Sequence, residues 1–199
     1  MNVQIQNWTN GFELFSCRLA DLYAAMDQAY RKKAEHYGFL CHGCTDNCCF
    51  THFHHHTFIE YMFIRQGYLD LNPIIQDEIM RRAKRDAGRI PYGDAERGCP
   101  VNFDGRCILY PFRPMICRLH GIPHELHPPG RPAIFGSGCE FFDLSCCKQD
   151  MIRLDRTPFY AEMAKLENEF KKGSGIDRKI KMTVAEMVLA INRFPQNDS

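Results

Sequence analysis

The cysteines are the feature of this sequence that most restricts how the chain can fold. The stretch CHGCTDNCC, residues 41–49, holds four of them, and CPVNFDGRCILYPFRPMICR, residues 99–118, holds three more. Cys41 and Cys44 have C-x-x-C spacing, which lets two thiolates bind one ion while nearby backbone amides donate hydrogen bonds to the sulfurs. Two cysteine-rich segments separated by helices favour a shared metal ion or cluster over unrelated thiols.

Disulfides are a poor explanation for these cysteines. The chain has 11 cysteines in 199 residues, an odd number that cannot pair completely within one chain. A domain of this length can bury a sizeable core without covalent cross-links. The N-terminus lacks a basic segment followed by an apolar one, so we expect a cytoplasmic protein, and the reducing cytosol disfavours structural disulfides.

Charge and hydropathy exclude two classes of partner. The 24 acidic and 25 basic residues leave a formal charge of +1, and no stretch approaches the roughly 18 apolar residues of a membrane span. The basic stretch RRAKRDAGR, residues 81–89, is expected to be the solvated face and positive C-terminal end of a helix. We therefore expect no nucleic acid and no membrane partner. The identity of any protein or small-molecule partner stays open.

Helical periodicity and capping residues predict most of the regular structure. Five helices are expected, over residues 18–37, 57–67, 72–87, 157–173 and 183–195. Thr57 and Glu60, like Thr183 and Glu186, form the T-x-x-E pattern of a capping box. Asn72 before Pro73 and Thr157 before Pro158 resemble an N-cap followed by proline at the first helical position.

Between residues 89 and 156 the composition shifts to proline, glycine, phenylalanine and cysteine. Such a segment cannot be regular helix, and CILYPF, residues 107–112, is its one expected short strand. A loop region this long needs a reason to be ordered, and metal ligation supplies one. The sequence thus predicts one domain, residues 1–199, that is mainly α: about five helices around a loop-rich, metal-binding cysteine core, with little or no sheet.

The cysteine segments resemble the CxxCxxCC family, also called YkgJ-like and described as zinc- or iron-chelating domains. That family shows C-x-x-C-x-x-C-C, then C-P, then C-x-I-Y-x-x-R-P-x-x-C-R. The matching positions here are Cys41, Cys44, Cys48 and Cys49, then Cys99 with Pro100, then Cys107, Tyr110, Arg113, Pro114, Cys117 and Arg118. The resemblance covers roughly residues 19–120 and implies a metal or iron–sulfur site without a settled reaction.

The chain departs from the family pattern in two places. Three residues rather than two separate Cys44 from Cys48, and Leu109 replaces isoleucine. The extra residue leaves open whether Cys48 or Cys49 is the ligand. Cys139 lies outside the shared pattern and is added from its place downstream of the second segment. The candidate metal ligands are Cys41, Cys44, Cys48, Cys49, Cys99, Cys107, Cys117 and Cys139.

The nature of the metal is the next question. Iron–sulfur clusters accept irregular cysteine spacings and often have proline after a ligand, as Cys99 does, which favours a 4Fe-4S cluster. Structural Zn²⁺, which often uses two C-x-x-C pairs, is the alternative. Arg113 and Arg118 are candidates to offset the negative charge of either centre, or else to form ion pairs with carboxylates.

Two functions follow from these alternatives. An iron–sulfur protein would have a redox or modification-enzyme role, since flagellin lysine methylases, larger relatives of the family, carry a similar cluster. A structural zinc module would instead organise a surface for a protein partner. Whether the chain is an enzyme stays open. Cys146, Cys147 and the histidines at 52 and 54–56 are left without an assigned role, although one of these histidines is a further candidate ligand or proton carrier.

Overall fold

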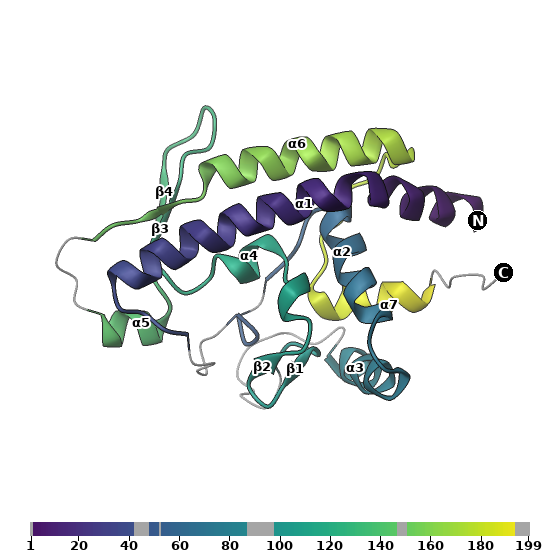
Figure 1. Cartoon of the computed structure of the whole chain (residues 1–199), viewed down its shortest axis with the longest axis horizontal. Coiled ribbons are helices and arrows are strands. Elements are labelled where there is room, and N and C mark those ends of the chain that lie inside the picture. The colour runs from purple at the N-terminus through teal and green to yellow at the C-terminus, as the bar shows by residue number, and fades with distance from the viewer. Residues whose placement is uncertain (1, 42–47, 52, 87–97, 147–150, 194–199) are drawn as a thin grey trace.

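A computed structural model of the chain describes residues 2–41, 48–51, 53–86, 98–146 and 151–193. Its longest helix, α1 (Asn2–His36), follows the long axis of the molecule, and α6 (Thr157–Ser174) lies alongside it (Figure 1). Only the part of α1 from residue 18 onward was expected. The apolar stripe extends further toward the N-terminus, because Trp8 and Phe12 are buried and Phe12 and Phe15 pack edge-on against Phe170 of α6.

Three further helices complete the helical core. They are α2 (Phe58–Leu69), α3 (Pro73–Asp86) and α7 (Val184–Arg193). Helix α2 packs against both α6 and α7, and α3 packs against α7. Ile59, Ile79 and Met187, one from each of these helices, have no exposed surface. The prediction of a mainly helical chain is confirmed.

Two predicted helix starts are confirmed at the level of individual hydrogen bonds. The side-chain oxygen of Asn72 accepts a 2.9 Å hydrogen bond from the Ile74 amide at the start of α3. At α7, the Glu186 carboxylate accepts from the Thr183 amide (2.7 Å) and the Thr183 hydroxyl accepts from the Glu186 amide (3.2 Å). This reciprocal pair is a capping box.

The predicted helix ends are less accurate. Helix α2 continues past Gly67 to Leu69, and Gly67 instead lies so close to the Phe112 ring that a side chain there would overlap it. Helix α6 passes Gly173 and ends at Ser174. The next residue, Gly175, has the left-handed φ of +66° typical of a C-terminal cap. The ends expected at residues 87 and 195 lie outside the described residues.

The cysteine-bearing region between α3 and α6 is built from short elements. They are β1 (Asn102–Phe103), β2 (Arg106–Cys107), the 3₁₀ helix η1 (Tyr110–Phe112), α4 (Met115–Arg118), β3 (His124–Leu126), β4 (Ile134–Gly136), α5 (Glu140–Ser145) and β5 (Leu154–Asp155). Strands β1 and β2 form an antiparallel pair, and β3 lies between antiparallel β4 and parallel β5.

These short elements correct two details of the prediction. The described residues contain seven α-helices rather than five, because α4 and α5 are single short turns inside the expected loop region. The strand expected over CILYPF is wrong. Only Cys107 is in a strand, and Tyr110–Phe112 turns into 3₁₀ conformation, with the Phe112 amide donating to the Leu109 carbonyl at 2.9 Å.

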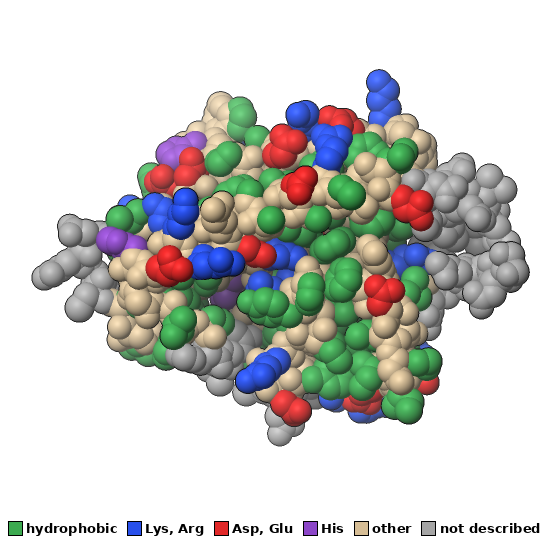
Figure 2. Space-filling model, in the orientation of Figure 1, with side chains coloured by type: hydrophobic (Ala, Val, Ile, Leu, Met, Phe, Trp, Pro, Cys, Tyr) green, Lys and Arg blue, Asp and Glu red, His purple; other side chains and the backbone are tan. Residues whose placement is uncertain are grey.

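The surface mixes both signs of charge. On the face shown in Figure 2, acidic and basic side chains are interspersed with hydrophobic ones. Within the described residues, no helix combines the length and the apolar character that crossing a membrane requires.

Candidate metal centre

The two cysteine segments meet through their backbones. The Cys99 amide donates a 2.7 Å hydrogen bond to the Cys49 carbonyl. Gly98, the residue before Cys99, packs against the Phe50 ring, and a Cβ atom at Gly98 would come within 3.1 Å of it. Residues about fifty positions apart in the sequence are therefore held side by side at the place where both segments carry cysteines.

A tight hairpin fixes Cys107 relative to Cys99. The Asn102 amide donates to the Cys99 carbonyl at 2.9 Å, and Asn102 pairs with Cys107 across strands β1 and β2. Asp104 and Gly105 both have positive φ, 50° and 79°, as a two-residue type I′ turn requires. The sequence Asp-Gly thereby sets the register that brings the two cysteines to one end of the hairpin.

Cys117 lies on α4, and buried polar groups hold the start of this short helix. The Met115 amide donates to the Glu60 carboxylate of α2 at 2.7 Å. Glu60 also accepts from the Tyr23 hydroxyl of α1 (3.3 Å) and from the Thr57 hydroxyl (2.6 Å). One buried carboxylate therefore links α1, α2 and α4. The local T-x-x-E pattern indicates only a capping box at Glu60, so this role was not predicted.

Arg118 secures the other end of α4. Its guanidinium forms a 2.7 Å ion pair with Asp27 of α1 and donates to the carbonyls of Arg113 and Pro111. It also lies 4.1 Å from the centre of the Tyr23 ring. Arg118 thus forms the internal ion pair considered above, with Asp27 as its partner, and its positive charge also lowers the pKa of Cys107.

The thiols near the junction of the two cysteine segments, where the Cys99 amide bonds to the Cys49 carbonyl, interact electrostatically. Burial raises the pKa of Cys99, Cys107 and Cys117, that of Cys107 to about 11, and negative charge on neighbouring thiols raises each of them further. The pKa of Cys48 is raised first by a hydrogen bond with the Cys49 thiol and then by burial. Uncharged thiols are therefore favoured at neutral pH, and thiolates here need compensating positive charge.

Arg113 supplies part of that charge. It lowers the pKa of Cys48, Cys107 and Cys117. Its own side chain is held by stacking on the Tyr110 ring, 3.6 Å from the ring centre, and by a 3.1 Å hydrogen bond to the Tyr110 carbonyl. A fixed cation next to three thiols favours their ionised, metal-binding form.

The complete ligand set is not assembled in the part of the chain that the structure describes. No three of its Cys, His, Asp and Glu side chains meet closely enough to hold a metal ion, and none of its cysteines is joined in a disulfide. Cys44 lies outside the described residues. Cys41 is exposed and Cys139 is buried. The pKa of Tyr30 is raised mainly by burial and further by negative charge on these two thiols.

The histidines that follow the first cysteine segment differ from one another in burial. His55 is buried and pairs through its backbone with Met182, whereas His54 and His56 are exposed and His52 lies outside the described residues. Burial lowers the pKa of His55. His55 therefore has a structural position between α2 and the segment that leads into α7.

The donor chemistry nevertheless fits a soft metal. Thiols are the preferred ligands of zinc and of iron–sulfur clusters, and those of Cys48, Cys99, Cys107 and Cys117 interact electrostatically with one another. Comparison of the chain with family models, curated proteins and solved structures found no match, so the resemblance to the YkgJ-like family stays a prediction from the cysteine pattern.

Proposed function

We propose that this protein binds a metal centre through cysteine thiolates, with Cys48, Cys99, Cys107 and Cys117 as the central ligands and an iron–sulfur cluster as the first candidate. The observation that carries the proposal is the 2.7 Å hydrogen bond from Cys99 to Cys49, because it joins the two cysteine segments beside thiols that raise one another's pKa. Cys41, Cys44, Cys49 and Cys139 are the candidates for additional ligands.

The charge balance of the junction supports a bound cation. Buried thiols with raised pKa values lose their protons readily only when positive charge is added nearby. Arg113 contributes one such charge, and a metal ion or cluster would contribute the rest. The protein's own part is to hold the thiols of Cys99, Cys107 and Cys117 on a hairpin and a short anchored helix.

An iron–sulfur cluster would supply one-electron chemistry when bound. The Cys99-Pro100 pair and the irregular cysteine spacing favour it. A redox or modification-enzyme role follows from this choice, and the reaction itself is not part of the proposal.

A structural zinc module is the second candidate. It is favoured by the way the cysteines lie on small elements, a two-stranded hairpin and a one-turn helix, that make few regular backbone hydrogen bonds. Metal binding orders such segments efficiently because its binding free energy adds directly to folding. In this case the centre would organise a surface for a partner protein.

Metal analysis of anaerobically purified protein tests the proposal. We expect brown protein with thiolate-to-iron absorption, and with iron and sulfide in it. Cys117→Ser should lose this metal, while Cys17→Ser, which changes an exposed cysteine of α1 outside both segments, should keep it. Colourless protein with bound zinc supports the second candidate. Folded wild-type protein free of any transition metal contradicts both.

A further inference from the structure

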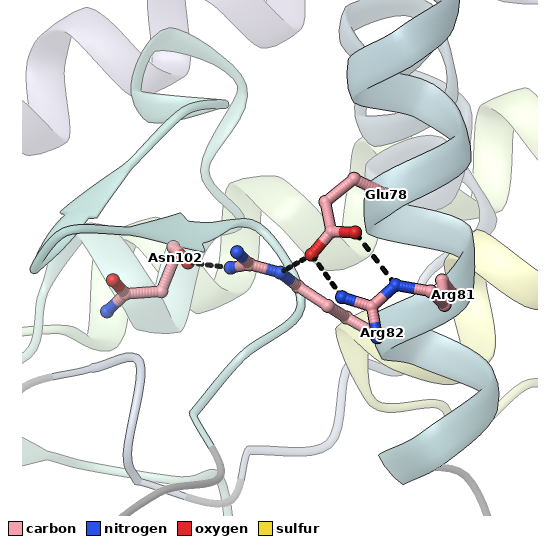
Figure 3. Close-up of polar contacts among 4 residues, drawn as sticks. All are labelled: Glu78, Arg81, Arg82 and Asn102. Carbon is pink, nitrogen blue, oxygen red and sulfur yellow. Dashed lines mark hydrogen bonds and ion pairs between the residues drawn. The ribbon is translucent and has the colours of Figure 1, made fainter.

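Two neighbouring arginines of α3 share one carboxylate but differ in their other contacts. Arg81 donates twice to Glu78, at 2.8 and 2.7 Å, and its side chain is 66% exposed. Arg82 donates to the same carboxylate at 2.6 Å, and its second nitrogen, Nη1, reaches the carbonyl of Asn102 at 2.6 Å (Figure 3). Of these two arginines, Arg82 is thus the one that connects α3 to the hairpin of β1 and β2, which carries Cys107 and follows Cys99.

Arg82 contacts both residues of strand β1. In addition to its bond to Asn102, its guanidinium lies 4.0 Å from the centre of the Phe103 ring. Hydrogen bonds from an ionised donor and contacts between a cation and an aromatic face are both stronger than their neutral counterparts when partly shielded from water. Glu78 orients the guanidinium for these contacts by holding its Nε atom.

Asn102, whose carbonyl Arg82 holds, is linked to both cysteines of the hairpin. The Asn102 amide donates to the Cys99 carbonyl, and Asn102 is the cross-strand partner of Cys107. A shift of β1 away from α3 would therefore move Cys99 and Cys107 together with Asn102.

We propose that Arg82 is a positioning residue of the thiolate centre: by clamping β1 against α3, it fixes where Cys99 and Cys107 present their thiols. This inference rests on the proposed metal-binding function. Arg82 acts through the backbone of Asn102. Lysine is a poor replacement because one ammonium group lacks the planar fork that bonds Glu78 and Asn102 at once.

Arg82→Gln and Arg81→Gln form a matched pair for testing this role. Each substitution removes one positive charge from α3 and one partner of Glu78, but only the first breaks the contact with the hairpin. The measurement is the rate at which each protein, loaded with cobalt(II), releases the metal to a chelator, followed by thiolate-to-cobalt absorption. We expect about tenfold faster release from Arg82→Gln, as for other residues that orient metal ligands, and a change below about twofold for Arg81→Gln.

A third variant and a second measurement keep the test decisive. Arg82→Lys should release cobalt at an intermediate rate, and it replaces Arg82→Gln if that variant does not fold. In metal-free protein, mass spectrometry follows alkylation of Cys99 and Cys107, which should be several-fold faster in the Arg82 variant than in wild type and unchanged in Arg81→Gln.

The two measurements separate this inference from the proposed function. If wild-type protein takes up no cobalt, the metal-binding proposal fails, and the alkylation rates alone decide whether Arg82 positions the hairpin. If Cys99 and Cys107 are alkylated at the same rates in the Arg82 variant as in Arg81→Gln, the inference is overturned even where metal binds. Equal cobalt release from the two glutamine variants does the same.

Discussion

At the scale of single residues, His124 shows how position changes a titratable group. Its ring lies over Gly136 of the neighbouring strand, and its Nδ1 atom is buried. Burial, followed by the positive charge of Arg156, lowers the pKa of His124 to about 4. The folded protein therefore prefers the neutral ring, whereas an unfolded histidine titrates near about 6.5.

This difference predicts a pH dependence of stability. Between about pH 6.5 and about pH 4 the unfolded chain binds a proton that folded His124 does not. The associated stability is complete above this window and is lost as the pH falls through it, by at most about 1.4 kcal/mol per pH unit. Urea denaturation at both ends of the window should show a smaller loss for His124→Gln than for wild type.

The control for this experiment is His127→Gln, since His127 is exposed just beyond the same strand. It should lose as much stability as wild type across the window. An identical pH dependence in all three proteins contradicts the assignment to His124.

At the scale of elements, the start of α2 depends on another helix. Thr57 is its N-cap residue but makes no side-chain capping bond. The amides of Phe58 and Ile59 donate instead to the Glu167 carboxylate of α6, at 2.9 and 3.0 Å. A buried carboxylate thus satisfies two helix-start amides that have no partner within their own helix.

Glu167→Ala should therefore destabilise the protein by about 2 kcal/mol, because it leaves two buried amides without acceptors. Glu169→Ala is the matched control on the same helix. Glu169 forms an exposed 2.6 Å ion pair with Arg18, and such pairs contribute at most about 1 kcal/mol. Chemical denaturation measures both losses, and hydrogen exchange at Phe58 and Ile59 locates the first. Equal losses from the two variants would show that α2 does not need this cap.

At the scale of the whole molecule, the helices and the cysteine region differ in how much regular backbone structure they contain. Helices α1 and α6 bury aromatic side chains against each other, with Phe170 fully buried between Phe12 and Phe15. The region of residues 98–118 consists of two-residue strands and single turns. It is attached to α1, α2 and α3 by polar contacts and also by apolar packing, such as that of Phe112 against Phe63 of α2. Loss of the metal proposed above should therefore affect the second part far more than the first.

Removal of the metal with a chelator tests this division. The free energy of unfolding should fall by about 3 kcal/mol, the value for a metal present at about a hundred times its dissociation constant. Hydrogen exchange should become faster for residues 98–118, while the amides between Phe12 and Met26 of α1 stay protected. Uniformly faster exchange in both parts would mean that the metal, if bound, supports the helical core as well.

Much of the fold was predictable because it follows from local rules. Apolar side chains at helical spacing identify the helices, and Asn72 caps α3 through the amide two residues on. The Asp104-Gly105 turn that pairs Asn102 with Cys107 also follows a local rule, although it was not predicted. The candidate site was predictable to the extent that cysteines cluster in two segments. The contacts of Asp27, Arg82 and Glu167 were not, because each joins residues far apart in the sequence.

The two T-x-x-E motifs separate what the sequence determined from what the tertiary structure decided. At Thr183 and Glu186 the motif lies on the surface, so its groups bond to each other as the local pattern requires. At Thr57 and Glu60 the same pattern also starts a helix, but Glu60 is buried where α1 and α4 meet and accepts from Tyr23 and Met115. The local sequence thus placed both of these helix starts. A buried carboxylate, in contrast, bonds to whichever donors the folded chain places beside it, because water cannot reach it.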